Sequence, residues 1–385
     1  MIPRKRIAYV TTYDATDIHK WSGLGYVMSK LLESNETEVN LIGNLAKPSK
    51  RFFKLKEYYY KYLLKKTCHF MREPRTAKFF SAQVEKCINP NTNLIFSPGT
   101  IPIAYLNTNI PKVFYTDATF AGMLDFYGGY TNLSKETIRH GHQLEQAAID
   151  SSALAIYASD WAAQSAIEHY GANPDKVKVV PFGANLHSER TETDIHNLIS
   201  KRNSENCELL FIGVDWERKG CNLAVEITKQ LNDLGLKTRL NIVGLSEIPL
   251  DTIPDYIVNH GFISKATIEG RERINNLLAQ SHFLIVPSFA EAYGLVFSEA
   301  SSYGVPSLSH RVGGIPTVVR DGINGKTFEL NTAVDVWCNY ITKTFSDSKY
   351  YHSLCLSSFN EYQKRINWRV AGETIHQLLN DLVSK

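Results

Sequence analysis

The sequence predicts a two-domain α/β protein in which each domain is built on a parallel β-sheet with helices on both faces. Three observations support this prediction. The chain has 385 residues, which is long for a single domain. Apolar strand-like runs alternate with helical segments throughout, a pattern that requires parallel sheets with covered faces. A polar stretch between residues 188 and 206 divides these segments into two halves.

The first half, residues 1–187, is expected to form an N-terminal Rossmann-like domain with six short strands. The apolar runs that predict these strands cover residues 6–12, 39–43, 94–97, 112–116, 154–158 and 177–180. Residues 181–185 close this half, and residues 188–206 are expected to be a linker because they are almost entirely polar.

The second half, residues 207–366, repeats the alternation and predicts a second Rossmann-like domain. Its expected strands cover residues 208–214, 239–243, 256–258, 283–286 and 307–309. The last segment, residues 367–385, begins an amphipathic helix whose apolar stripe is Ile375, Leu378, Leu379 and Leu382.

Composition and charge exclude several classes of protein. The net charge of +3 is too small to indicate nucleic-acid binding by itself, and 43% hydrophobic residues argue against disorder. The six cysteines lack metal-ligand spacing, which disfavours zinc and a disulfide framework and favours a reducing compartment. No run approaches the roughly eighteen uncharged apolar residues of a membrane span, and Asp14 interrupts the N-terminal apolar run too early for a signal peptide. We therefore expect a cytoplasmic protein.

Residues 287–299 are the most informative part of the sequence. They follow the apolar run 283–286 and enter a stretch of helical periodicity from about Tyr293 to Tyr303. The first turn of a helix has unpaired amides and the positive end of the dipole, so residues 292–296 are expected to bind phosphate. Gly294 has no side chain, so a phosphate can approach the backbone closely at this position. Glu291 and Glu299 flank this helix start, which suits a nucleotide-sugar with its diphosphate between them.

Three motifs follow in order: Tyr-Gly-Val-Pro at 303–306, Val-Gly-Gly-Ile-Pro at 312–316 and Asp-Gly-Ile-Asn-Gly at 321–325. Together with the two glutamates eight residues apart, they resemble the retaining glycosyltransferases of family 4, which have the GT-B fold. The resemblance covers most of the chain and is strongest over residues 211–328. It implies two Rossmann-like domains facing across a cleft, with the acceptor bound by the first and the nucleotide-sugar by the second. It also implies that helix 367–385 crosses back to the first domain, although a last core helix explains its pattern equally well.

The same resemblance implies roles for the residues of the second domain. Glu291 would contact hydroxyls of the donor sugar, and Glu299 would contact those of the ribose. The diphosphate and the nucleobase would be held by Tyr293, Gly294, Leu295 and Val296 and by Phe262 and Ile263, respectively. Phe262 fits a position in the core equally well.

Residues 211–220 combine a strand, a loop and a helix start with two adjacent cations. Arg218 and Lys219 suit a diphosphate. Arginine forms bidentate hydrogen bonds with two phosphate oxygens, and lysine supplies a positive charge on a flexible side chain. The family usually has Gly-Arg after this strand; the resemblance implies that Gly213 contacts the donor, but Val214 stands where the family has the arginine. Arg218 is the candidate replacement for that arginine. A solvated Arg-Lys pair at a helix terminus is the alternative.

Two segments of the first domain match family positions that contact the donor. Gly23 and Gly25 open a helix after the first strand, where backbone amides can approach a phosphate. The third glycine of a dinucleotide fingerprint is missing, so NAD is disfavoured and a plain tight turn is the alternative. Asp117 follows a strand, with Thr116 where the family often has His. Asp117 either contacts the donor sugar or caps the next helix.

Residues 47–66 contain eight cations and a single acid, Glu57, interleaved with aromatic and apolar residues. On a helix, one stripe is formed by Phe52, Leu55, Tyr59, Tyr62 and Leu63. This composition is typical of an interfacial helix on anionic lipid. A core-packed helix with a solvated basic face explains the pattern equally well. RNA binding is less favoured because no nucleic-acid motif accompanies the patch.

The resemblance predicts a retaining hexosyltransferase of class EC 2.4 that needs no metal or other cofactor and takes part in glycan, polysaccharide or glycolipid assembly. The expected catalytic residues are Glu291, Lys219, Arg218 and Asp117. The expected partners are a nucleotide-sugar, a glycan or lipid-linked acceptor and, through residues 47–66, the anionic inner face of the cytoplasmic membrane; nucleic acid is not expected. Two alternatives stay open: a non-hydrolysing nucleotide-sugar epimerase and a catalytically silent nucleotide-sugar-binding partner, the latter suggested by Val214 and Thr116.

Overall fold

A computed structural model describes residues 5–186 and 189–383. The chain forms two compact units, of which the first extends to Val180 and includes the segment from Gly372, and the second is Pro181–Ala371. The expected boundary between residues 187 and 188 lies outside the described residues, as does the side chain of Phe52. Among the described helices, none combines the length and the apolar composition that crossing a bilayer requires.

The first unit is built on a six-stranded parallel sheet with the order β2-β1-β3-β4-β5-β6. Its strands are β1 Lys5–Val10, β2 Thr37–Ile42, β3 Leu94–Ser97, β4 Lys112–Thr116, β5 Leu154–Tyr157 and β6 Val177–Val179. Every residue of β3 and β5 is buried, because helices cover both faces of a parallel sheet.

The first unit has six described α-helices before its C-terminal segment, and three of them begin at side-chain caps. The six helices are α1 Leu24–Leu31, α2 Arg51–Tyr58, α3 Pro74–Cys87, α4 Phe120–Met123, α5 Lys135–Ser151 and α6 Asp160–Tyr170. A π-helical turn, η2 Tyr59–Leu63, continues α2, and short 3₁₀ turns are η1 Lys20–Gly23, η3 Phe70–Arg72, η4 Gly128–Tyr130 and η5 Pro174–Lys176. Ser159 caps α6, because its hydroxyl accepts a hydrogen bond from the amide of Ala162 at 3.2 Å.

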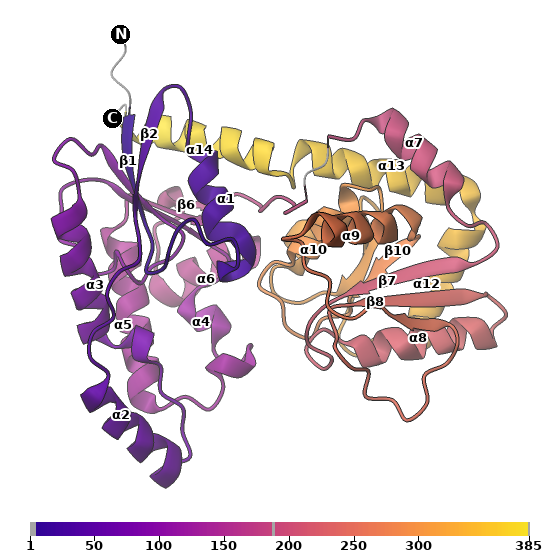
Figure 1. Cartoon of the computed structure of the whole chain (residues 1–385), viewed down its shortest axis with the longest axis horizontal. Helices are drawn as coiled ribbons and strands as arrows, with labels where there is room; N and C mark the ends of the chain where they lie inside the picture. Colours follow the sequence, from indigo (N-terminus) through magenta and orange to yellow (C-terminus); the bar gives the residue numbers. More distant parts are fainter. Residues whose placement is uncertain (1–4, 187–188, 384–385) are drawn as a thin grey trace. The chain divides into compact units, whose positions relative to one another are not determined.

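The second unit has its own six-stranded parallel sheet, with the order β12-β11-β10-β7-β8-β9. Its strands are β7 Cys207–Ile212, β8 Thr238–Val243, β9 Ile257–Asn259, β10 Phe283–Ile285, β11 Ser307–His310 and β12 Gly325–Phe328. Its helices are α7 Glu192–Lys201, α8 Cys221–Asp233, α9 Ile268–Gln280, α10 Leu295–Ser301, α11 Ile315–Val318, α12 Val334–Ser346 and α13 Ser348–Lys364. Figure 1 shows α8 on one side of this sheet and α9 and α10 on the other.

The strand order of the second sheet predicts where a ligand binds. Starting from β7, the chain adds β8 and β9 on one side and then β10, β11 and β12 on the other. The order therefore reverses between β7 and β10. In open α/β sheets, ligands bind outside the carboxyl ends of the strands at this switch point. The loops that leave β7 and β10 carry the residues singled out from the sequence.

Two elements were not expected. The segment predicted to be a linker contains α7, which begins at a capping box between Thr191 and Asp194 and buries Ile195 and Ile199. The linker prediction was wrong for this part because the many polar residues outweighed the two buried isoleucines of an amphipathic helix. Strand β12 was missed because its glycine and lysine give it a weak strand pattern; it forms at the sheet edge by pairing with β11.

The two-sheet architecture and the long C-terminal helix confirm the predicted fold. Helix α14, Trp368–Val383, begins in the second unit and continues into the first. There the ring of His376 contacts the carbonyl oxygen of Leu31 at 2.8 Å, and the side chain of Asn380 accepts a hydrogen bond from Lys5. Gly372 also lies against Leu31. This helix therefore contributes to the packing of the first unit, as the crossing-back prediction required.

Candidate functional site

The loops that follow β7 and β10 lie against each other at the switch point of the second sheet. The amide of Phe289 donates to the carbonyl oxygen of Arg218 at 2.8 Å, which joins the two loops. Gly220, the N-cap of α8, has φ +69°, and a Cβ added there would overlap the carbonyl oxygen of Pro287. The close approach therefore requires glycine at this position. It brings Lys219 within reach of the β10 loop.

Lys219, Arg218 and Glu291 form a charged group at this point. The ammonium of Lys219 contacts Oε2 of Glu291, and Nη1 of Arg218 lies 3.8 Å from the same oxygen. Arg218 also donates from Nη1 to the carbonyl oxygen of Ala290 at 3.0 Å. Its loop is fixed by Asp215, whose Oδ1 accepts from the amide of Arg218 at 2.9 Å. Both cations are half-buried and held against a buried carboxylate, so they are not a solvated surface pair.

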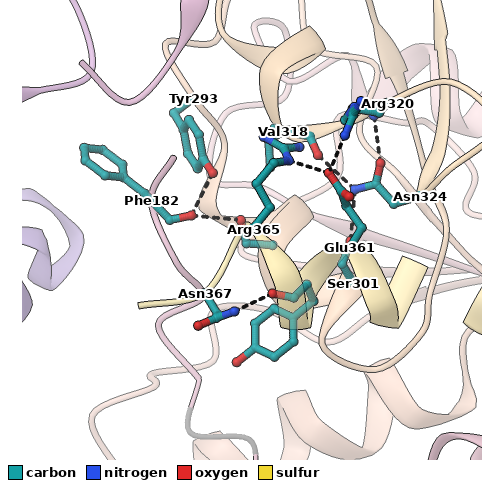
Figure 2. A network of polar contacts seen from close by, with 11 residues as sticks. Phe182, Tyr293, Ser301, Val318, Arg320, Asn324, Glu361, Arg365 and Asn367 are labelled. Atoms are coloured by element: carbon teal, nitrogen blue, oxygen red, sulfur yellow. Dashed lines mark hydrogen bonds and ion pairs between the residues drawn. The ribbon is translucent and has the colours of Figure 1, made fainter. Parts of the chain in front are cut away.

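Helix α10 begins at Leu295, two residues later than expected, after Gly294 with φ +90°. The amides of Leu295 and Val296 lie in its first turn, where intrahelical partners are lacking. The side chain of Tyr293 is buried and already bonded: its hydroxyl donates to the carbonyl oxygen of Phe182 at 2.7 Å (Figure 2). Burial raises the pKa of Tyr293 accordingly. Only the backbone of Tyr293 is therefore available to a ligand here.

Glu299 lies inside α10 and is 1% exposed. Its two carboxylate oxygens accept hydrogen bonds from Nζ of Lys265 at 2.6 and 2.5 Å. Lys265 lies in the loop between β9 and α9, and sequence analysis did not single it out. No local pattern marks this lysine, because its partner is 34 residues away. The buried carboxylate is thus charge-compensated from outside its own helix.

The aromatic candidate for the nucleobase lies in the open. Phe262 is 70% exposed, which excludes the alternative that it belongs to the core. Ile263, its neighbour, is buried. Gly261 precedes them with φ +67°, and its carbonyl oxygen accepts from the amide of Gly244 at 2.8 Å, which ties this loop to the end of β8. Val214, where the family has arginine, is exposed.

The candidates of the first unit lie at the carboxyl ends of its strands. Gly23 is the N-cap of α1 with φ +80°, and the carbonyl oxygen of Gly25 accepts from the hydroxyl of Tyr9 at 2.6 Å. Asp117 directly follows β4 and is half-buried. The N-cap of α4 is Thr119, whose hydroxyl accepts from the amide of Gly122 at 3.0 Å. The capping role considered for Asp117 is therefore filled by another residue.

Two of the motifs that follow Glu299 in the sequence form hydrogen bonds with α10 and with the loop that carries Glu291. The side-chain Nδ2 of Asn324 donates to the carbonyl oxygen of Val318 at 2.8 Å and to the hydroxyl of Ser301 at 3.2 Å, which ties the Asp-Gly-Ile-Asn-Gly loop to the end of α10 (Figure 2). Gly314, in the Val-Gly-Gly-Ile-Pro motif, donates its amide to the carbonyl oxygen of Glu291 at 3.1 Å. These motifs hold α10 and Glu291 in place.

A comparison with known protein families matches the part of the chain that contains the candidate site of the second unit. Residues 194–355 match the family described as glycosyl transferases group 1. A D-inositol 3-phosphate glycosyltransferase of Corynebacterium aurimucosum is 25% identical over 266 residues, which are 62% of this chain and 59% of the relative. One of Nocardiopsis dassonvillei is 31% identical over 173 residues, covering 41% and 40%. The chain thus spans less than two thirds of the length of these curated relatives.

Solved structures show the same fold over almost the whole chain. A sucrose-phosphate synthase from Thermosynechococcus elongatus has a TM-score of 0.70 at 15% identity, covering 99% of this chain and 100% of that one. A glycosyltransferase from Rickettsia africae has a TM-score of 0.66 at 15% identity, covering 99% of both. The chain therefore has the GT-B fold, and Lys219, Glu291 and Glu299 lie within the residues 194–355 that match the glycosyl transferases group 1 family.

Proposed function

We propose that the protein is a retaining glycosyltransferase that moves a sugar from a nucleoside-diphosphate donor to an acceptor hydroxyl in glycan, polysaccharide or glycolipid assembly. The observation that carries this proposal is the group formed by Lys219, Arg218 and Glu291 at the switch point of the second sheet. Two cations and a carboxylate at the carboxyl ends of β7 and β10 suit a diphosphate attached to a sugar.

Each part of the donor has a candidate partner in the second unit. The exposed ring of Phe262 is offered to the nucleobase, and the buried carboxylate of Glu299 to the ribose hydroxyls. The amides of Leu295 and Val296 approach the diphosphate, and Glu291 takes hydroxyls of the sugar. In the first unit, Gly23, Gly25 and Asp117 are still predicted to contact the nucleotide-sugar donor. A protein from Anabaena whose structure is similar to this chain, with a TM-score of 0.62 at 16% identity, was solved in complex with UDP and glucose. UDP-sugars are therefore the first donors to test.

The proposed reaction is a front-face substitution. The bond between the sugar C1 and the diphosphate oxygen breaks, and the bond from C1 to the acceptor oxygen forms on the same face. The acceptor proton passes to the leaving diphosphate, which serves as the base. Negative charge therefore grows on the diphosphate, where Lys219 and Arg218 stabilise it. This scheme needs no metal, and the side chains at the site supply the charge that a metal would otherwise provide.

We also propose a cytoplasmic location. All six cysteines are free thiols, and five of them are buried. Free cysteines are typical of proteins in reducing compartments.

Two measurements test the proposed function: the rise in Tm caused by a nucleoside diphosphate, and the rate of sugar transfer. Both are made on the same set of single variants. Glu299→Ala is expected to abolish the rise in Tm that a nucleoside diphosphate causes in the wild type, since about 2.7 kcal/mol of stabilisation is expected at a hundred times Kd. Glu291→Ala is expected to keep that rise but lose sugar transfer. Glu269→Ala, at an exposed position of α9, is the control and should change neither. Full transfer by Glu291→Ala at saturating donor would show that its assigned role is wrong.

Incubation with donor alone distinguishes the remaining alternatives. A transferase leaves the sugar configuration unchanged without acceptor, whereas an epimerase converts the donor into its epimer. Binding of the donor without transfer to any of a broad set of acceptors would support the catalytically silent partner. The position of Arg218 beside Glu291 argues against that alternative, because it supplies a second cation despite Val214.

A further inference from the structure

In the helical segment 51–63, made of α2 and η2, most of the described apolar side chains are exposed, and Phe53 is partly buried beside the polar anchors. Its inner side is formed by Phe53, Lys56 and Tyr60, which are spaced three and four residues apart. The outer residues Leu55 and Leu63 are 72% and 69% exposed. This arrangement is the reverse of an ordinary surface helix, which buries its apolar stripe. For the described members of the stripe, Leu55, Tyr59, Tyr62 and Leu63, the core-packed alternative is therefore wrong.

Ion pairs hold this segment on the first unit. The ammonium of Lys56 lies 2.5 Å from a carboxylate oxygen of Glu73 and 2.9 Å from one of Glu136. The hydroxyl of Tyr60 donates to Glu136 at 3.2 Å. His140 completes this cluster, with Nδ1 3.4 Å from Glu73. Lys56 is thus ion-paired to both carboxylates, and the cluster tethers the segment to the rest of the first unit.

The outward surface combines apolar, aromatic and basic side chains. We call it the outer patch, and its apolar members are Leu55, Tyr58, Tyr59, Tyr62, Leu63 and Leu64, all exposed. Exposed cations surround these residues, namely Lys47, Lys50, Arg51, Lys54, Lys61, Lys65 and Lys66. Glu57 is the single acid between residues 47 and 66. An exposed apolar patch of this kind marks an interaction site, and its surplus of positive charge requires an anionic partner.

We propose that the outer patch docks the protein on an anionic lipid surface. Leucines and tyrosines on a basic segment match the composition of helices that lie in the membrane interface. Tyrosine suits this layer because its ring is apolar and its hydroxyl remains hydrated. Leu55, Leu63 and Leu64 favour lipid over nucleic acid, since leucine neither stacks on bases nor binds phosphate. This inference comes from the first unit and does not depend on the proposed function.

Vesicle sedimentation tests the proposal. Wild-type protein is expected to sediment with vesicles that contain about one third phosphatidylglycerol at 50 mM salt, to be released at 500 mM, and to ignore pure phosphatidylcholine. The triple variant Lys54→Gln, Lys61→Gln, Lys65→Gln should lose about a hundredfold in partitioning, because each cation contributes about fivefold. The double variant Leu55→Ser, Leu63→Ser should weaken binding to the same vesicles at 50 mM salt although all cations are kept, since it removes the apolar part.

A charge-matched control decides whether the effect belongs to the outer patch. Lys86→Gln, Lys176→Gln, Lys349→Gln removes the same charge at exposed positions elsewhere and should change partitioning less than twofold. All substituted side chains are exposed and Lys56 is kept, so Tm should stay at the wild-type value. The proposal is overturned if wild type ignores anionic vesicles at low salt, if the control loses as much as the triple variant, or if single-stranded RNA binds through the outer patch while vesicles do not.

Discussion

Nζ of Lys265 forms a bidentate contact with Glu299, at 2.6 and 2.5 Å from its two carboxylate oxygens. Glu299 is 1% exposed, and the side chain of Lys265 is 36% exposed. The lysine thus compensates a buried carboxylate that the proposed function offers to a ribose. A ligand that donates hydroxyls to Glu299 has to share it with this ammonium.

We expect Lys265→Met to destabilise the protein by about 2 kcal/mol, because it leaves a buried carboxylate unpaired. The loss is smaller than for a fully buried pair, since Lys265 is partly hydrated. The double variant with Glu299→Gln should recover part of it, because the uncompensated charge is then gone. Lys229→Met, which breaks an exposed pair with Asp233, is the control and should cost less than about 1 kcal/mol. Urea unfolding gives these values, and equal losses for Lys265→Met and Lys229→Met would contradict the assignment.

Lys219 and Arg218 are expected to act mainly on turnover, since charge on the leaving diphosphate increases as the glycosidic bond breaks. Lys219→Met should lower kcat about a hundredfold and change KM for the donor less than threefold. Arg218→Met should lower kcat about tenfold, because its guanidinium is farther from Glu291. Steady-state transfer assays separate the two parameters. Lys237→Met, at an exposed position before β8, should behave as wild type. Unchanged kinetics of Arg218→Met would show that its contacts with Ala290 and Glu291 serve only the structure of the loop.

The sequence predicted the central strands and the loops between them because the signals are local. The buried run that became β10 is followed by Pro287, which marked the end of that strand, whereas the strand expected over residues 208–214 ends at Ile212, before Gly213. Parallel sheets then place both loops at one edge. The contact between Lys219 and Glu291 follows from this topology.

Other features depend on contacts between distant segments and have no local signal. Lys265 meets Glu299 because the loop after β9 lies beside α10. The exposure of Phe262 and of Leu55 likewise depends on which neighbours pack against them, and the sequence left both open between core and surface. Helix α7 differs: its capping box at Thr191 and Asp194 is a local signal that the polar composition of the segment outweighed.

Arg202, at the end of α7, is expected to be essential for the stability of the second unit. Its guanidinium is buried and donates to the carbonyl oxygens of Tyr303 at 2.8 Å and Gly304 at 3.1 Å, and to the hydroxyl of Tyr351 at 2.9 Å. Arg202→Met should cost about 3 kcal/mol, because these buried acceptors lose their donor. Lys201→Met, the exposed neighbour, should be nearly neutral. A loss for Arg202→Met no larger than for Lys201→Met, measured by urea unfolding, would refute this role.

His282 is expected to make the protein less stable in mild acid. Its Nδ1 accepts from the amide of Glu208 at 2.9 Å. Burial and, secondarily, the positive charge of Arg202 lower the pKa of His282 to about 3, although a hydrogen bond with the backbone of Asn203 opposes them. The unfolded chain has a pKa of about 6.5 for this residue. Below pH 6.5 the unfolded state therefore binds a proton that the folded state does not, and stability is lost as the pH falls from 6.5 towards 3.

The expected loss is about 1.4 kcal/mol per pH unit in this window, or about 2 kcal/mol between pH 7 and pH 5. His282→Gln keeps a polar side chain but cannot titrate, so its unfolding free energy should fall by about 2 kcal/mol less over the same interval. Urea unfolding at pH 7, 6 and 5 on both proteins measures the difference, and the other histidines contribute equally to both. Parallel pH dependences for the two proteins would show that His282 is protonated equally in the folded and unfolded states.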